Sequence, residues 1–177
     1  MIDTKIQTID SVLSRYREAL GQDYFGYRNH CYRVSNFSKL FDISTSEYQL
    51  VSSVAAFHDL GIWTNKTFDY IDHSINLMKL HHAMQSDAHD LLLSIEMIKN
   101  HHKIFSLDKS ASRLVEVFRK CDWIDITFGV RNFGINRKKI REILSTFPNS
   151  GFHKYLLRLS AKRIKTNPFD PFPMMKL

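Results

Sequence analysis

The helical spacing of apolar residues is the feature that most constrains the fold of this chain. Apolar side chains recur every three or four residues along almost its whole length, and no stretch sustains the period-two alternation typical of a strand. Only six glycines and four prolines interrupt this pattern, and three of the prolines fall within the last ten residues. The sequence therefore predicts an all-α fold.

About eight helices account for the pattern. We expect Gly21 to end the first helix and Gly61 to end the third, because glycine favours helix termination. Ser44 and Glu47 form a capping-box pattern at the start of the third helix, and Asn136 is expected to cap the seventh. The predicted helices cover approximately residues 4–20, 27–41, 44–60, 70–84, 87–100, 112–127, 136–146 and 151–165.

Length and composition indicate one folded domain over residues 1–177, because 177 residues can bury a continuous core. Apolar residues make up 44% of the chain and charged residues 24%, which is ordinary globular composition. No apolar run approaches the roughly 20 residues needed to span a bilayer. The polar start of the chain does not resemble a signal peptide, so we expect a cytoplasmic protein. Two cysteines, Cys31 and Cys121, are too few for a disulfide scaffold, and we interpret them as small buried side chains.

The chain carries a net charge of +7, and much of the excess lies between residues 131 and 165. Such a balance favours anionic partners, which include phosphorylated small molecules, nucleotides and nucleic acid. Scattered lysines and arginines on helices are also typical of a solvated surface, so this alternative stays open. The proline-rich tail after residue 166 cannot continue as a helix, but its Phe and Met residues predict that it packs against the body.

Histidines are concentrated in one part of the chain. Eight of the nine fall in the 73 residues from His30 to His102, and one of them begins the pair His58-Asp59 after an apolar helix. Adjacent side chains on a helix point about 100° apart and can share a metal only near a helix end. Imidazole with a neighbouring carboxylate is a donor set for a divalent transition metal. The pair therefore predicts a metal site completed by residues from other helices.

The order His30, then His58-Asp59, then Asp122 resembles the signature of the HD superfamily of metal-dependent phosphohydrolases. The local contexts, residues 30–34, 55–61 and 119–125, are similar to the family's first, second and last motifs. The resemblance covers about residues 27–129 and leaves the C-terminal helices and tail, 130–177, outside.

The resemblance implies an HD-type helical bundle in which His30, His58, Asp59 and Asp122 bind a divalent metal ion. It also implies hydrolysis of a phosphate ester or anhydride, with a nucleotide-like substrate and with Asp59 acting together with a metal-bound water. The implied cofactor is one or two ions of Mn, Mg, Fe, Ni or Co.

A second ion is implied by three further histidines. His73 lies fourteen residues after Asp59, about where dinuclear members of the family place a ligand. The pair His101-His102 is similar to the family's paired-histidine motif, in which the first histidine is the favoured ligand. Asp59 would then bridge the two ions.

The chain departs from the family pattern after Gly61, where many catalytic members carry a lysine and this chain has Ile62-Trp63. Arg33, Lys66 and Lys103 are candidates to bind substrate phosphate in its place. Asp125 is a candidate for contacting substrate, for orienting a ligand histidine, or for a surface position. The rival hypotheses are a catalytically inactive HD-type module that binds metal or nucleotide, and a nucleic-acid-binding module that uses the basic helices. The oligomeric state stays open.

Overall fold

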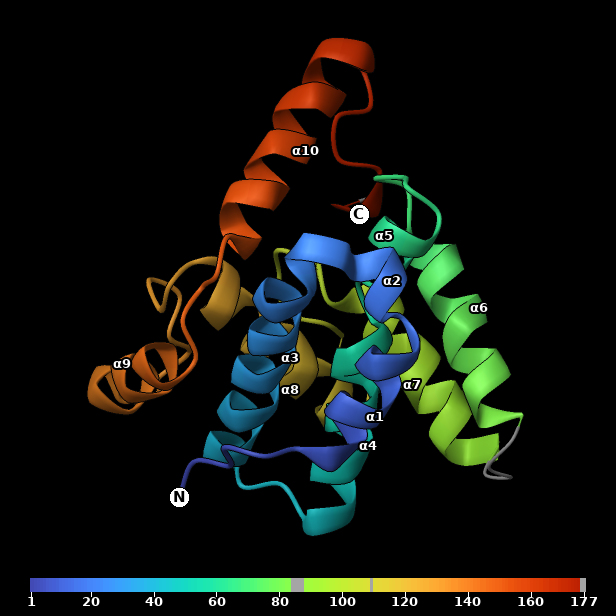
Figure 1. Ribbon diagram of the computed structural model, residues 1–177. Coiled ribbons are helices and arrows are strands. Elements are labelled where there is room, and N and C mark those ends of the chain that lie inside the picture. Colours follow the sequence, from blue (N-terminus) through green and yellow to red (C-terminus); the bar gives the residue numbers. More distant parts are fainter. Residues whose placement is uncertain (84–87, 109, 176–177) are drawn as a thin grey trace.

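The computed structural model describes residues 1–83, 88–108 and 110–175, and over these residues it is all-helical (Figure 1). Eight α-helices in this part of the chain have nine residues or more, which confirms the predicted fold class. None of the described helices is long and apolar enough to cross a membrane. The α-helices are α1 (Gln7–Arg15), α2 (Arg17–Leu20), α3 (Tyr24–Ser38), α4 (Thr45–Phe57), α5 (Gly61–Thr64), α6 (Ile71–His82), α7 (Ala88–Asn100), α8 (Arg113–Ile126), α9 (Arg137–Thr146) and α10 (Phe152–Thr166), with 3₁₀ turns at Gly21–Asp23, Lys39–Phe41 and Pro173–Met175.

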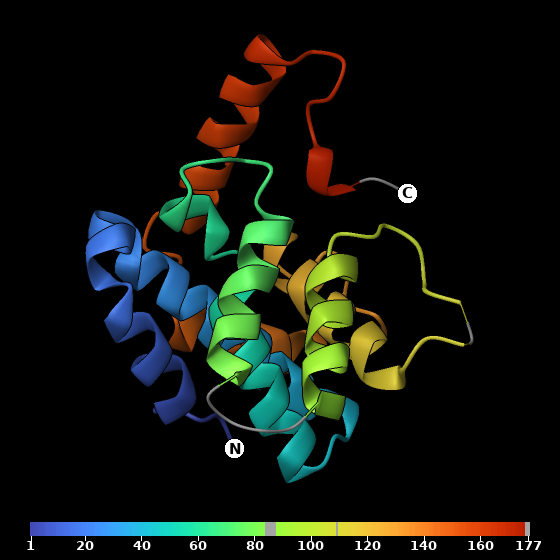
Figure 2. The same ribbon diagram turned by 90° about the vertical axis from the view of Figure 1, so that its right-hand side faces the viewer.

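Helix α3 is the central element, and it packs against α1, α4, α8 and α9. Most of its residues are buried, including polar ones such as His30, Arg33 and Asn36. A polar group without a hydrogen bond is costly in a core, so each of these side chains needs a partner on a neighbouring element. Helices α6 and α7 pack together on one flank of this core (Figure 2).

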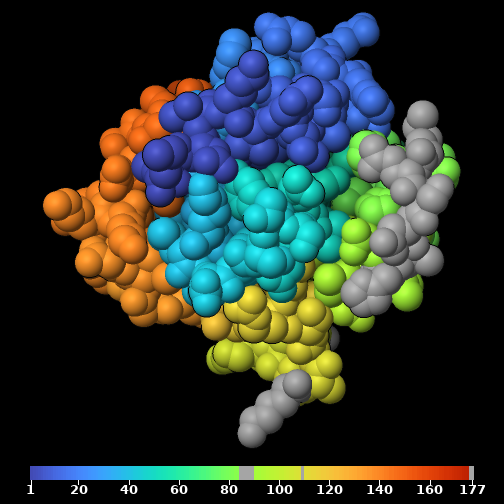
Figure 3. Space-filling view, turned by 90° about the horizontal axis from the view of Figure 1, so that it is seen from below, coloured from blue at the N-terminus to red at the C-terminus, as the bar shows by residue number. Residues whose placement is uncertain are grey.

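The N-terminal segment and the start of α8 both make polar contacts with the connection between α3 and α4. Lys39 at the end of α3 pairs with Asp3 at 2.9 Å, and Arg113 at the start of α8 donates to the carbonyl oxygens of Phe41 and Asp42. Figure 3 shows the connection lying between these two segments on the lower face. The central helix is therefore held at its C-terminal end by polar contacts from both sides.

Three predicted helix signals are confirmed. Ser44 and Glu47 form both hydrogen bonds of a capping box at the start of α4. The Asn136 side chain caps α9, and Gly21 follows α2 with a positive φ of 51°. The first predicted helix, 4–20, is instead divided into α1 and α2, because Tyr16 leaves helical geometry and packs edge-on against Phe57.

The prediction that Gly61 ends the third helix is wrong. Helix α4 ends at Phe57, a turn follows, and Gly61 begins α5 with no positive φ. Its role is close packing instead, because a Cβ at Gly61 would lie 2.6 Å from the carbonyl oxygen of Tyr70 and 3.0 Å from the backbone nitrogen of Ser74. The Gly61 N–H also donates to the Ser74 hydroxyl at 3.0 Å. Glycine thus lets the chain after His58-Asp59 lie directly on the start of α6.

Helix α10 rises from the body and the tail returns beside it (Figures 1 and 2). Within residues 167–175 of the tail, the structure has the short 3₁₀ turn Pro173–Met175, in which Pro173 is buried. Arg163 of α10 holds the tail through the backbone carbonyl of Asp170 at 3.1 Å. The tail thus packs against the rest of the chain through Pro173 and Met174, whereas the prediction is wrong for Phe169, which is fully exposed.

Both cysteines are buried and unpaired, as predicted. Burial, together with the neighbouring charges of Asp59 and Asp122, raises the pKa of the Cys31 and Cys121 thiols well above its usual value. Neither thiol is therefore set up as a nucleophile.

Gly61→Ala is expected to destabilise the protein by about 1 to 3 kcal/mol, because the added methyl group must displace backbone atoms of α6. Urea unfolding would measure the change in the free energy of unfolding. Lys79→Ala, at an exposed position of α6, is the control and should change stability by less than about 0.5 kcal/mol. Equal stability of Gly61→Ala and the wild type would contradict the close approach.

Candidate metal centre

Four separate elements bring the central side chains of the candidate metal centre together. His30 lies in the middle of α3, and His58 and Asp59 occupy the turn between α4 and α5. His101 directly follows α7, and Asp122 lies in α8. All five side chains are buried, with at most 2% of each residue exposed. These five residues are called the candidate centre, or the centre, below.

The three histidines present the same ring nitrogen to the middle of the centre. His30 Nδ1 lies 2.6 Å from a carboxylate oxygen of Asp125. His58 and His101 place Nδ1 at 2.8 and 2.7 Å from backbone carbonyl oxygens three residues earlier in the chain. A carbonyl or carboxylate oxygen only accepts, so Nδ1 carries the proton in each ring. Nε2 is therefore the atom that each ring turns inward, and it offers a lone pair to a metal, as in a metal-ligating histidine, once it carries no proton.

The inward atoms of His30, His58, Asp59 and Asp122 converge. The two Nε2 atoms of His30 and His58 are 3.0 Å apart. Asp59 Oδ2 lies 3.4 Å from His58 Nε2, and Asp122 Oδ1 lies 3.5 Å from His30 Nε2. Ligand atoms about 2.1 Å from a shared ion lie roughly 3 to 4 Å apart. The spacing therefore suits one cation.

A second group of potential ligands shares Asp59. The group consists of Asp59, His101 and His102, and Asp59 Oδ1 lies 3.4 Å from His101 Nε2. The other oxygen, Oδ2, faces His30 and His58. The two oxygens of one carboxylate thus face two different groups, which is the arrangement needed to bridge two ions.

The charges at the centre also suit a cation. Asp59 Oδ1 and Asp122 Oδ1 are buried and accept no hydrogen bond from the described residues. Burial alone raises the pKa of Asp59 and Asp122, but the neighbouring histidines hold the pKa of both carboxyls below its usual value. Burial alone would likewise lower the pKa of His58, yet the two carboxylates raise it to about 9. Buried carboxylates that lack donors are costly, so the residues present fit a bound divalent ion.

Arg33 and Asp125, both candidates for binding substrate, instead pair with each other. Arg33 is 1% exposed, and its guanidinium makes two hydrogen bonds to the Asp125 carboxylate, at 2.5 and 2.8 Å. A third bond, of 2.9 Å, joins Arg33 to the carbonyl oxygen of Phe147. Of the three alternatives for Asp125, the geometry matches the one in which it orients His30. Neither side chain is available to a substrate.

The remaining predicted residues differ in their relation to the two groups of potential ligands. His73 is on α6 and belongs to neither group of potential ligands, so its role as a ligand stays a prediction. Lys66 and Lys103 are exposed and line two other cavities. His102 does belong to the second group, and its Nε2 contacts the hydroxyl of Tyr70. Burial and the neighbouring His101 lower the pKa of His102 to about 3, so this ring is neutral at physiological pH.

A cavity of about 280 Å³, called the apolar cavity below, borders the centre. Asp59, Asp122 and His102 form part of its wall, so the potential ligands are accessible from it. None of the described residues that line it is a lysine or an arginine. Its apolar wall is supplied by α8, α10, the tail and the loop before α6, through Phe68, Trp123, Ile126, Phe128, Leu156, Leu157, Phe172, Met174 and Met175.

Three aromatic residues at the centre were not predicted. The Tyr70 hydroxyl lies 3.5 Å from His101 Nε2 in addition to its contact with His102. The Tyr27 hydroxyl accepts a hydrogen bond from the backbone N–H of Asp59 at 3.2 Å, and Phe152 stacks on the ring of His30 at 4.2 Å. Tyr27 precedes His30 by three residues, so helical spacing placed both on one face, whereas no local pattern marks Tyr70.

Comparison of the chain with protein-family models, with curated proteins and with solved structures finds no match in any of the three.

Asp125→Asn is expected to destabilise the protein by about 3 to 5 kcal/mol at neutral pH, because it leaves the buried Arg33 charge without its counter-ion. Denaturant unfolding would measure the loss. The control is Asp3→Asn, which breaks the half-exposed pair with Lys39 and should cost less than about 1 kcal/mol.

The same variant tests the pH dependence. Burial alone raises the pKa of Asp125, but Arg33 and His30 hold it below its usual value. A carboxyl with a depressed pKa stabilises the fold above its unfolded-state pKa of about 3.9, and this contribution is lost as the pH falls below that value. The wild type should therefore lose stability below about pH 4 more steeply than Asp125→Asn. Parallel pH profiles would contradict a charged Asp125.

Proposed function

We propose that this chain is an HD-type, divalent-metal-dependent phosphohydrolase that acts on a phosphate ester or anhydride of a nucleotide-like substrate. One observation carries the proposal. Three histidine Nε2 atoms and two buried carboxylates face a common centre, and that centre borders a cavity of about 280 Å³. The order of these residues in the sequence supports the same family.

In this proposal His30, His58, Asp59 and Asp122 hold one ion. Asp59, His101 and His102 would hold a second. Donor sets that mix imidazole nitrogen with carboxylate oxygen suit Mn, Fe, Co or Ni better than Mg, which prefers oxygen ligands.

A bound divalent ion would activate a water and offset the charge of the phosphoryl group. Other residues of the chain orient the side chains that would hold the ion. Asp125 fixes the ring of His30 with its proton on Nδ1, and Tyr27 fixes the backbone at Asp59. Burial and the charge of Asp59 raise the pKa of Tyr70 well above its usual value, so its hydroxyl keeps its proton and can donate to a phosphoryl oxygen. The apolar wall limits the access of bulk water, which strengthens these interactions.

A second candidate is a catalytically inactive module that binds a metal or a nucleotide. One observation favours it, namely that no described residue lining the apolar cavity is a lysine or an arginine. A phosphohydrolase of this form would depend on its metal ions alone to neutralise the substrate at the reacting phosphate.

The proposal predicts that purified protein contains one or two divalent ions per chain and that Asp59→Ala loses most of this metal. Phosphate release from a nucleotide panel in Mn, Mg, Ni and Co should fall at least about 100-fold in the variant, because the ion supplies several kcal/mol of charge stabilisation. Elemental analysis and a phosphate assay measure both effects. Asp69→Ala removes an exposed carboxylate from the nearby loop and should change neither.

Full metal content in Asp59→Ala would overturn the ligand assignment. Metal binding without release of phosphate from any member of the panel would overturn the phosphohydrolase proposal in favour of the catalytically inactive module.

A further inference from the structure

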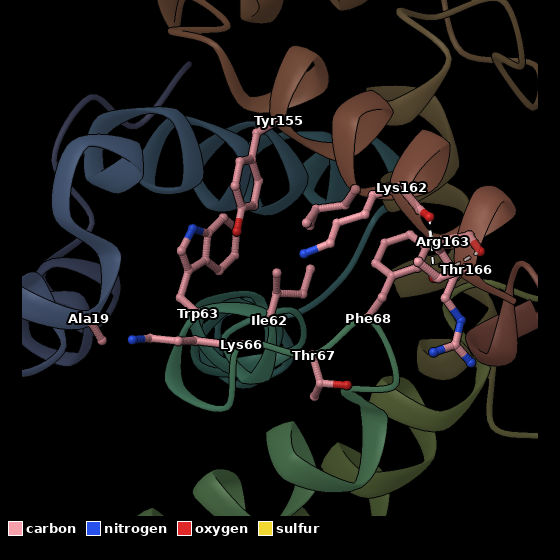
Figure 4. A pocket seen from close by; sticks show the side chains of 11 residues that line it. Ala19, Ile62, Trp63, Lys66, Thr67, Phe68, Tyr155, Lys162, Arg163 and Thr166 are labelled. Atoms are coloured by element: carbon pink, nitrogen blue, oxygen red, sulfur yellow. Dashed lines mark hydrogen bonds between the residues drawn. The ribbon is translucent and has the colours of Figure 1, made fainter.

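A second cavity, of about 500 Å³, lies beside the apolar cavity, and Phe68 lines both. Its walls are α5, the loop that follows α5, and α10 (Figure 4). It is called the cationic cavity below. This volume lies within the range of about 300–1,000 Å³ that is usual for small-molecule sites.

The cationic cavity carries the charge that the apolar cavity lacks. Lys66, Lys162 and Arg163 line it, and no described residue of its lining is an aspartate or a glutamate. Arg163 also pairs with Asp170 of the tail, at 3.5 Å. The structure gives Lys66 and Lys162 no ion pair with a described carboxylate, so two ammonium groups are available to a ligand.

Figure 4 shows how these cations are arranged. The ammonium group of Lys162 points into the cavity between the Trp63–Tyr155 pair and Phe68, and Lys66 extends along the opposite wall toward Ala19. The two lysines come from elements far apart in the sequence, so only the fold brings them to the same cavity.

The aromatic wall of the cavity is preformed. Trp63 and Tyr155 stack with ring centres 5.3 Å apart and planes 15° from parallel. The Trp63 indole N–H donates to the Asp23 carboxylate at 3.1 Å, which fixes the ring and occupies the nearby acid. A ligand would therefore meet a fixed surface with cations on two sides, which lowers the entropic cost of binding.

The two cavities are complementary in charge. Asp59 and Asp122 form part of the wall of the apolar cavity, where a metal-held phosphate would lie, and Lys66 and Lys162 line the cationic cavity on the other side of Phe68. Lysine ammonium groups bind phosphate oxygens through charge-assisted hydrogen bonds. We propose that the cationic cavity binds a second anionic group of the substrate, so that the preferred substrate is a small phosphoester with two separate phosphate groups. This inference rests on the proposed function for the first of these groups.

The chain's only two tryptophans provide a direct test, because Trp63 lines the cationic cavity and Trp123 lines the apolar cavity. Their indole N–H signals in ¹H–¹⁵N spectra of the full-length protein with Mg²⁺ report on the two cavities separately. Adenosine 3′,5′-bisphosphate should shift both signals, and inorganic phosphate at the same concentration should shift that of Trp123 alone.

The variant Lys66→Gln/Lys162→Gln should abolish the Trp63 response and weaken bisphosphate binding at least about tenfold, as expected for two lost charge-assisted contacts. The matched control is Lys154→Gln/Lys165→Gln, which removes the same charge from exposed positions of α10 outside the cavity lining. It should bind like the wild type. In turnover, the cavity variant should lower kcat/KM for the bisphosphate at least about tenfold more than it lowers kcat/KM for p-nitrophenyl phosphate.

A Trp63 signal that does not respond to the bisphosphate, or that still responds in the cavity variant, would overturn the anion subsite. If Trp63 responds and the cavity variant abolishes the response, but no phosphate is released in any metal, the anion subsite stands and the phosphohydrolase fails. A ten-nucleotide single-stranded DNA that binds at least tenfold more tightly than the bisphosphate, through the same two lysines, would replace the small molecule with nucleic acid.

Discussion

The rest of this structure depends on the buried hydrogen bonds that the carboxylate of Asp125 accepts. The carboxylate accepts hydrogen bonds from His30 and Arg33 of the central helix, and thereby ties α8 to α3 in the interior. Through Arg33 the same group reaches the carbonyl oxygen of Phe147, where α9 gives way to the segment leading to α10. The buried Asp125 thus orients the inward-facing ring of His30 and helps to position α10, which lines both neighbouring cavities. Such a group is costly to bury and more costly to disturb, because Arg33 would lose its counter-charge and His30 its hydrogen-bond acceptor in a medium of low dielectric constant.

The centre places charged side chains inside a helical core, and the two neighbouring cavities offer different charged groups to a ligand. Carboxylates and imidazoles line one side of Phe68, and ammonium groups line the other side. In the proposed function, this division lets a cation bind on one side without competing with lysines for the same carboxylates. It also accounts for Ile62-Trp63 after the His58-Asp59 turn, because these side chains line the cationic cavity while Lys66 and α10 supply its charge.

Helical spacing was sufficient to predict the fold class, and the order of His30, His58-Asp59 and Asp122 was sufficient to predict four members of the centre. These signals are local or depend on spacing along the chain. The roles of Arg33 and Asp125 depend on which charges meet across the interior, and a sequence does not show that two buried groups neutralise each other. Gly61 was misread for a related reason, because glycine ends helices often and close packing against α6 leaves no local mark. Tyr70 was not predicted because no sequence pattern marks the position before α6. Only the fold brings its hydroxyl to His101 and His102.

The origin of the cavity walls has a consequence for how such a chain can change over evolutionary time. All the inward-facing nitrogen and carboxylate atoms come from residues 30–122, whereas much of the surface a small molecule would touch comes from α10 and the returning tail. Phe152 and His153 contact His30 and Asp125, but substitutions after residue 154 can reshape the binding surface while leaving the polar centre and its supporting hydrogen bonds intact. In the proposed function, part of the substrate selectivity would therefore lie in a stretch of sequence separate from the polar centre, so descendants of this chain could change ligand choice through substitutions in α10 and the tail.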